Sequence, residues 1–140
     1  MIKTIGILIV THGNLSRELV ESCKLFCGEP DHVRALCLNP ADDIGELRAR
    51  VSSEVDGLDR GEGVLVFVDL FGGSPSNCAA ANMKNQHFEC LTGVNLPMLI
   101  EALNGRDHCV LEELAERCMK AGSNGILNLR HKIAQRKAVS

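Results

Sequence analysis

The chain has 140 residues, the length of one compact domain rather than two. Hydrophobic residues make up 45% of it, which argues against intrinsic disorder and provides enough apolar material for a core. The formal net charge of −3 and the absence of Trp and Tyr give no reason to expect nucleic acid as a partner.

The N-terminal apolar run lies within residues 1–10 and is far too short to span a bilayer. It also lacks the small-residue cleavage site of a secretory signal. No other segment approaches the roughly 20 apolar residues that a membrane helix needs. We therefore expect a soluble, cytoplasmic protein.

Seven cysteines occur in the chain, an odd number, and no C-x-x-C motif is present. Most of them fall within apolar, periodic segments of the sequence. In a reducing compartment this pattern favours small, buried hydrophobic side chains over metal ligands or disulfides. The cysteines are Cys23, Cys27, Cys37, Cys78, Cys90, Cys109 and Cys118.

The first half of the chain alternates apolar runs with helical patterns. Residues 5–10 form a nearly continuous, β-branched run, which predicts a strand buried on both faces. Apolar residues then recur at helical spacing over residues 15–26, and this helix is expected to end at Gly28. Residues 33–38 predict a second strand, and residues 44–58 carry the apolar stripe of a second helix.

The second half continues the same alternation. Residues 64–68 predict the third strand, which is the most hydrophobic after the first. A helix over residues 74–84 opens with serine as its N-cap and proline at its first helical position. Residues 88–92 predict a fourth strand, and helices are expected over residues 95–103 and 111–120.

The C-terminal segment is the least regular part of the pattern. Residues 126–129 could form a short final strand, and the residues that follow are basic and mostly polar. Nothing in the sequence repeats, and no linker suggests a second domain. We therefore expect one domain over residues 1–130 and a solvated, basic tail over residues 131–140.

Strands that alternate with helices predict an α/β fold, in which an open parallel sheet has helices on both faces. Ligands of such folds bind outside the carboxyl ends of the strands, where the strand order reverses. In the common order 2-1-3-4, that point lies between strands one and three. His12 and Asp69 follow directly after these two strands, which is the strongest functional indication from the residues alone.

His12 is expected at this crevice, beside the free N–H groups and the dipole of a helix N-terminus that can hold an anion. Histidine is a competent nucleophile when one ring nitrogen keeps its lone pair. A carboxylate on the other nitrogen fixes that tautomer and stabilises the charge that develops on attack. Asp69 is the candidate for this role. Taken alone, His12 is equally explained as a satisfied polar residue at a strand end.

A glycine-rich turn follows Asp69. Gly72 and Gly73 allow the backbone to approach a tetrahedral anion closely, and Ser74 is placed to donate a hydrogen bond to it. The same residues are equally explained as a tight turn with a serine cap. Thr11 and Asn14 flank His12 and could hydrogen-bond locally, and Asn14 is equally explained as a helix N-cap.

Other sites of chemistry are weakly indicated. The sequence contains neither G-x-x-x-x-G-K-[ST] nor G-x-G-x-x-G, so direct use of ATP or a dinucleotide is unsupported. The remaining histidines have no acids at useful spacing, and we interpret them as solvated surface groups. They are His32, His87, His108 and His131.

Three motifs at expected strand ends resemble those of one known family. They are Thr11-His12-Gly13, the ten residues VDLFGGSPSN at 68–77 and the seven residues GVNLPML at 93–99. Together they resemble the IIA component of the mannose-type bacterial phosphotransferase system (PTS). The similarity runs over residues 5–130, nearly the whole chain.

The resemblance implies a phosphoryl carrier without metal or bound cofactor. It implies that His12 accepts the phosphoryl group, that Asp69 orients the ring and that Ser74 lies near the phosphoryl group. Gly72, Gly73, Thr11 and Gly13 complete our candidate set of phosphoryl-binding residues. The implied donor is the histidine-phosphorylated carrier HPr, and the implied acceptor is a mannose-type IIB protein.

The resemblance also implies features that the residues themselves do not indicate. A fifth, antiparallel edge strand, here around residues 126–129, would be exchanged between the two subunits of a homodimer. Contact with the membrane would be indirect, through the IIC and IID permease components. Whether the chain serves sugar uptake or regulation, and which sugar is involved, stays open.

Two rival functions use the same first loop. A metal-ion chelatase of the tetrapyrrole pathway also places His-Gly after its first strand, but it needs a second metal ligand from a facing loop. A flavodoxin-like module would bind phosphate there, although no Trp or Tyr is available to sandwich a flavin. The glycine-rich turn has no role in the chelatase scheme.

Overall fold

A computed structural model describes residues 4–139 of the chain. Its sheet has four parallel strands in the order β2-β1-β3-β4, as the sequence predicted. The strands are β1 (Gly6–His12), β2 (Val33–Leu38), β3 (Val64–Val68) and β4 (Glu89–Leu91). The central strands β1 and β3 consist mainly of fully buried apolar residues, which is why both are nearly continuous hydrophobic runs.

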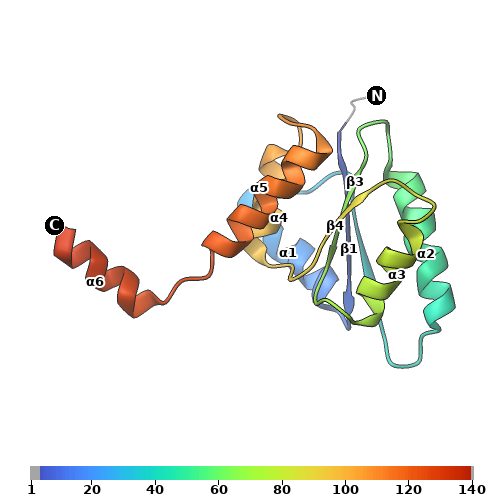
Figure 1. Ribbon diagram of the computed structural model, residues 1–140, viewed down its shortest axis with the longest axis horizontal. Coiled ribbons are helices and arrows are strands. Elements are labelled where there is room, and N and C mark those ends of the chain that lie inside the picture. The colour runs from blue at the N-terminus through green and yellow to red at the C-terminus, as the bar shows by residue number, and fades with distance from the viewer. Residues whose placement is uncertain (1–3, 140) are drawn as a thin grey trace.

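Helices cover both faces of this sheet (Figure 1). One face carries α1 (Leu15–Cys27), α4 (Leu96–Gly105) and α5 (Leu111–Asn124). The other face carries α2 (Ile44–Leu58) and α3 (Ser74–Asn82). The predicted α/β architecture with three layers is therefore confirmed.

Two hydrophobic clusters fill the spaces between the layers, and β1 contributes to both. Ile7 and Ile9 belong to the cluster under α1, α4 and α5. Leu8 and Val10 belong to the cluster under α2 and α3. Successive side chains of a strand point to opposite faces, so one short strand anchors both layers and fixes the position of its last residue, His12.

The C-terminal segment differs from the expected strand and tail. Residues 126–128 adopt no regular structure, and α6 (Leu129–Val139) begins where the strand was expected to end. Figure 1 shows α6 standing apart from the rest of the chain at the end of a short connector. A strand needs a neighbouring strand to pair with, and this segment leads away from the sheet. The residues that follow are mostly good helix formers, which explains the helix.

His32 is buried, and the prediction that it is a solvated group is wrong. The residue is 9% exposed, has a φ of 61° and places ring Nε2 2.5 Å from the carbonyl oxygen of Leu58. Its own carbonyl accepts a hydrogen bond from the N–H of Ile7. This hydrogen bond holds the loop before β2 against β1, and the His32 side chain is buried with the loop.

Among residues 4–139, no helix is both long and apolar enough to cross a membrane.

Candidate functional site

His12 and Asp69 meet because β1 and β3 are neighbours. Val10 and Val68 are paired in the sheet, so the residues that follow them emerge side by side at its carboxyl edge. Oδ2 of Asp69 lies 2.8 Å from ring Nδ1 of His12 and accepts the backbone N–H of the same residue at 3.0 Å. The pair expected from the two strand ends is present.

The Asp69 carboxylate is held in its ionised form. Burial acts to raise its pKa, but hydrogen bonds from the backbone and ring of His12 and from its own residue outweigh burial and lower the pKa. Oδ1 also accepts the backbone N–H of Leu70 at 3.1 Å. An ionised carboxylate is only an acceptor, so it selects the His12 tautomer with the proton on Nδ1 and the lone pair on Nε2.

The imidazole of His12 is partly open to solvent. The side chain of His12 is 46% exposed, whereas that of Asp69 is 11% exposed. The carboxylate is thus shielded behind the ring, and Nε2 is directed away from it. This arrangement presents a nucleophilic nitrogen to an incoming group.

Gly73 allows the ring to lie close to the start of α3. A Cβ atom at this position would lie 2.7 Å from Cε1 and 3.3 Å from Nε2 of His12. Gly73 is the N-cap of α3, and Ser74 and Pro75 open the helix. The first-turn amides of a helix lack intrahelical acceptors, so their partial positive charge lies beside Nε2. Ser74 is thus the first helical residue rather than the N-cap that the sequence predicted.

A groove of about 430 Å³ runs beside His12. Ser74 and the loop that follows β2 both line this groove, and the sequence analysis gave that loop no functional role. The lining residues are His12, Gly13, Leu38, Asn39, Pro40, Asp42, Ile44 and Ser74. The position of this loop could have indicated its role, because β2 is the neighbour of β1 and ends at the same edge of the sheet.

Thr11 and Gly13 make hydrogen bonds that hold the loop together, and the local hydrogen bond expected of Thr11 is present. The Thr11 side chain is fully buried, and its hydroxyl oxygen accepts the N–H of Ser16 at 2.8 Å. The N–H of Gly13 donates to the carbonyl of Leu38 at 2.7 Å, with a φ of 57° that favours glycine. Asn14 occupies the N-cap position of α1, but the bond that caps the helix comes from Thr11.

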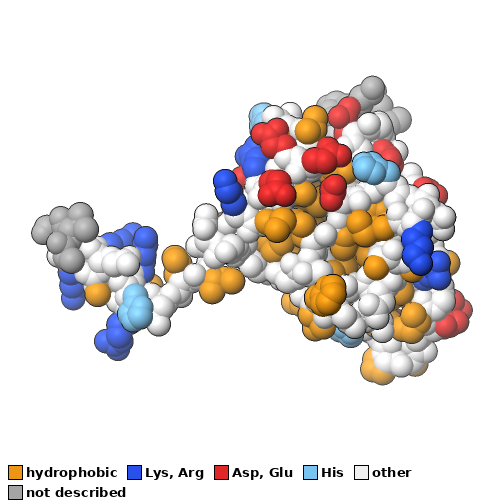
Figure 2. Space-filling view, in the orientation of Figure 1, with side chains coloured by type: hydrophobic (Ala, Val, Ile, Leu, Met, Phe, Trp, Pro, Cys, Tyr) orange, Lys and Arg blue, Asp and Glu red, His pale blue; other side chains and the backbone are white. Residues whose placement is uncertain are grey.

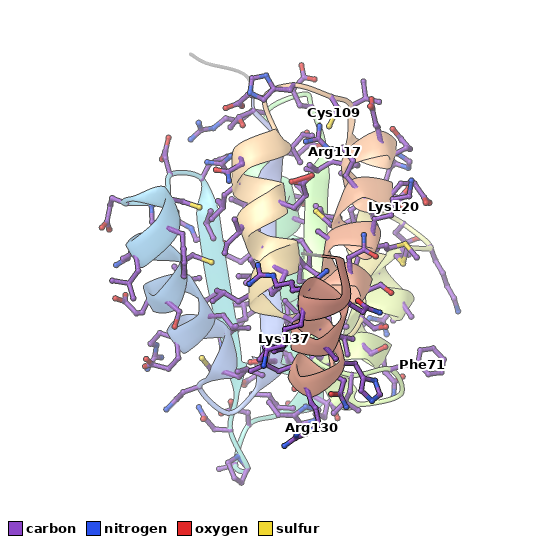
Figure 3. All side chains as sticks on the ribbon, turned by 90° about the vertical axis from the view of Figure 1, so that its left-hand side faces the viewer. Phe71, Cys109, Arg117, Lys120, Arg130 and Lys137 are labelled. Atoms are coloured by element: carbon purple, nitrogen blue, oxygen red, sulfur yellow. The ribbon has the colours of Figure 1, made fainter. Side chains whose placement is uncertain are left out.

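Two large apolar side chains lie exposed next to the pair, and the sequence analysis treated them only as part of a turn. Leu70 is half-exposed, and Phe71 is 85% exposed. Figure 3 shows Phe71 projecting from the edge of the molecule. Consecutive large apolar residues in a glycine-rich turn were the available signal for a contact surface.

The cysteines are mostly buried, as predicted, and all seven are free thiols. Burial raises the pKa of Cys23 to about 11 and those of Cys90 and Cys118 to about 12, so these thiols stay protonated. Among the residues described, no group of three or more His, Cys, Asp or Glu side chains is placed to hold a metal ion.

Fold and site together define an open, parallel α/β domain with a carboxylate-oriented histidine at the switch point of its sheet. Residues 6–119 match the family model for the PTS system fructose IIA component. The chain therefore belongs to the mannose and fructose IIA family of the bacterial phosphotransferase system, whose members are phosphoryl-carrying components of a phosphotransferase.

Relatives of assigned function support this family membership. The mannose-specific EIIAB component of Escherichia coli K12 is 33% identical over 137 residues, which are 96% of this chain and 42% of that protein. The chain thus spans less than half the length of that relative. The fructose-specific EIIA component of Bacillus subtilis is 32% identical over 111 residues, which cover 79% of this chain and 76% of that one.

Solved structures agree on the fold. The PTS IIA protein associated with the fucose utilization operon of Streptococcus pneumoniae superposes with a TM-score of 0.82 and 32% identity. The match covers 95% of this chain and 99% of that one. The EIIA component of Streptococcus agalactiae superposes with a TM-score of 0.83 and 27% identity, over 91% of this chain and 98% of that one.

Proposed function

We propose that this protein carries a phosphoryl group on Nε2 of His12, accepting it from an HPr-type phosphohistidine carrier and passing it to a mannose-type IIB protein. The observation that carries the proposal is the 2.8 Å contact between His12 Nδ1 and Asp69, which leaves Nε2 exposed at the start of α3. Membership of the IIA family supports the same class of chemistry.

In the transfer step, the Nε2 lone pair of His12 attacks the phosphorus atom of the donor's phosphohistidine. A new N–P bond forms while the donor N–P bond breaks, and the electron pair of the broken bond stays with the donor imidazole. The positive charge that develops on the His12 ring is balanced by the Asp69 carboxylate on Nδ1. Exchange between two imidazoles is nearly balanced in free energy, so the protein mainly positions the groups.

The start of α3 is the proposed cradle for the phosphoryl oxygens. Ser74 lines the same groove as His12, and Gly73, which follows Gly72 in the turn, keeps a Cβ atom out of the space 3.3 Å from Nε2. The first-turn amides of α3 and the Ser74 hydroxyl are the proposed donors to the phosphoryl oxygens. No metal or cofactor takes part in this scheme. The next transfer reverses the step, with the IIB protein as the attacking partner.

The assembly and cellular role are part of the same proposal. The chain acts in the cytoplasm as a homodimer in which the segment around residues 126–129, up to the start of α6 at Leu129, pairs with the edge strand β4 of a second copy. Its link to the membrane is indirect, through IIC and IID permease components, and it serves sugar uptake or its regulation. The open edge at β4 and the connector that leads away from the sheet are consistent with this exchange.

The test uses phosphoenolpyruvate, enzyme I and HPr with the purified protein, followed by intact-mass measurement. We expect the gain of one acid-labile, base-stable phosphoryl group. His12→Ala should abolish the gain, and His87→Ala, which alters a mostly exposed histidine, should leave it unchanged. An unphosphorylated protein in the presence of phosphorylated HPr from its own host, or a phosphorylated His12→Ala variant, would refute the proposal.

A further inference from the structure

Helix α6 carries a charge opposite to that of the rest of the chain. It holds four of the 15 basic residues and none of the 18 acidic ones, so the remainder of the chain has a formal net charge of −7. Figure 2 shows blue side chains on this helix, which lies apart from the other elements. An isolated basic segment of this kind is attracted to acidic surfaces.

The side chains of α6 are arranged as a contact surface. Leu129 and Ile133 are exposed and lie four residues apart, on one side of the helix. Lys132 and Arg136 flank this apolar stripe on one side, and Arg130 flanks it on the other. A helix of 11 residues is marginal on its own in water, since isolated helices shorter than about 12–15 residues are unstable. The stripe therefore needs a covering surface.

An acidic surface lies at the N-terminal end of α5. Glu112, Glu113 and Glu116 are all exposed there, and Figure 2 shows acidic side chains gathered over this part of the molecule. The carboxylate of Glu112 lies 3.6 Å from Nε2 of His87, two residues before β4 begins. The acidic end of α5 is thus next to the N-terminal end of the edge strand.

We propose that α6 of one copy docks on this acidic end of α5 in a second copy. The inference rests on the strand exchange of the proposed function. An antiparallel partner strand enters along β4 at Leu91 and leaves at Glu89, so the helix that follows it begins beside Glu112. Basic residues then meet acidic ones, and the Leu129–Ile133 stripe is covered by the partner. Because the dimer has twofold symmetry, this contact occurs twice in each dimer.

The test is a charge swap in the full-length protein, read as the dimer dissociation constant by sedimentation. We expect Lys132→Glu with Arg136→Glu to raise that constant about tenfold, and Glu112→Lys with Glu116→Lys to do the same. The combined variant should return to within about threefold of the wild type. Higher salt should weaken the wild-type dimer, because exposed ion pairs are screened.

A matched control changes the same amount of charge on the opposite face of the sheet. Arg48→Glu with Arg50→Glu on α2 should leave the constant unchanged. An α6 variant that behaves like this control, or a combined variant that does not recover, would overturn the proposal. A protein that is monomeric at every concentration would overturn it together with the strand exchange. Phosphorylation of His12, measured in the same samples, reports separately on whether the carrier function holds.

Discussion

A single carboxylate oxygen of Asp69 contacts both the backbone and the ring of His12. Oδ2 accepts the backbone N–H of His12 at 3.0 Å and lies 2.8 Å from ring Nδ1. Main chain and side chain of the same residue are therefore fixed against one carboxylate. The ring can neither rotate away nor exchange its tautomer without breaking a charge-assisted hydrogen bond.

Replacement of this carboxylate by an amide tests its role in the chemistry. Asp69→Asn can present an N–H to Nδ1, which favours the wrong tautomer and removes the balancing charge. We expect phosphorylation by HPr to slow by about 10²-fold or more in single-turnover measurements. Asp42→Asn alters a carboxylate at the rim of the groove and should keep the wild-type rate. An Asp69→Asn rate within about twofold of wild type would remove this residue from the mechanism.

Gly73 is the residue whose missing side chain makes room for the ring. Gly73→Ala places a Cβ 2.7 Å from Cε1 of His12, so the ring must move from its position at the start of α3. We expect a markedly slower phosphoryl transfer with a cooperative unfolding transition still present. Gly57→Ala is the control, since a Cβ there meets nothing within 4 Å, and it should stabilise α2 by about 1 kcal/mol. Equal transfer rates in the two variants would contradict the close-approach account.

A variant of Thr11 tests whether this residue stabilises the fold or binds the phosphoryl group. Thr11→Val leaves the N–H of Ser16 without its acceptor in a fully buried place, which should lower the free energy of unfolding by about 1–3 kcal/mol. The folded variant should still transfer the phosphoryl group at close to the wild-type rate. Urea unfolding and single-turnover kinetics measure the two effects, with the exposed Thr92→Val as control. A slow but fully stable variant would restore Thr11 to the ligand set.

Phe71 is expected to contact the partner proteins. Its side chain is 85% exposed beside the reactive histidine, so its removal should not destabilise the fold. We expect Phe71→Ala to raise the HPr concentration that gives half-maximal phosphorylation by about tenfold, with little change in the maximal rate. Leu25→Ala alters an equally exposed side chain near the end of α1 and should have no effect. The same result for both variants would place the docking surface elsewhere.

The buried His32 gives a pH dependence with a defined sign. Burial lowers its pKa below the usual 6.5 and outweighs the hydrogen bond to Leu58, which raises the pKa, while the positive charges of Arg60 and Arg106 lower it further. Below about pH 6.5 the unfolded state therefore binds the proton more readily, so stability falls as the pH drops toward the folded-state pKa. His32→Asn, which tolerates the positive φ, should flatten this slope in denaturant unfolding measured between pH 5 and 7. An unchanged slope would assign the effect to other groups.

The fold and the central pair were predictable because both rest on local patterns that tertiary packing reinforces. The continuous apolar runs before His12 and Asp69 identified two central strands, and the switch-point rule placed these residues together. The sequence pattern predicted that His12 and Asp69 lie close together, but it did not predict the distances between their atoms.

The remaining features depend on contacts between distant segments. His32 looked like a solvated loop residue, yet pairing of its backbone with Ile7 encloses it. A local hydrogen bond was expected of Thr11, but its partner, the N–H of Ser16 in the first turn of α1, could not be named from the sequence. The groove wall after β2 required the sheet order before its position could be known.

The two members of the reactive pair are 57 positions apart and come from different strands. During synthesis His12 emerges long before Asp69, and the ring has no oriented tautomer until β3 has taken its place beside β1. If His12 carries the phosphoryl group as proposed, we expect nascent and partly unfolded chains to be poor phosphoryl acceptors. Under the proposed function, the capacity of this protein to accept a phosphoryl group therefore arises only with the finished sheet.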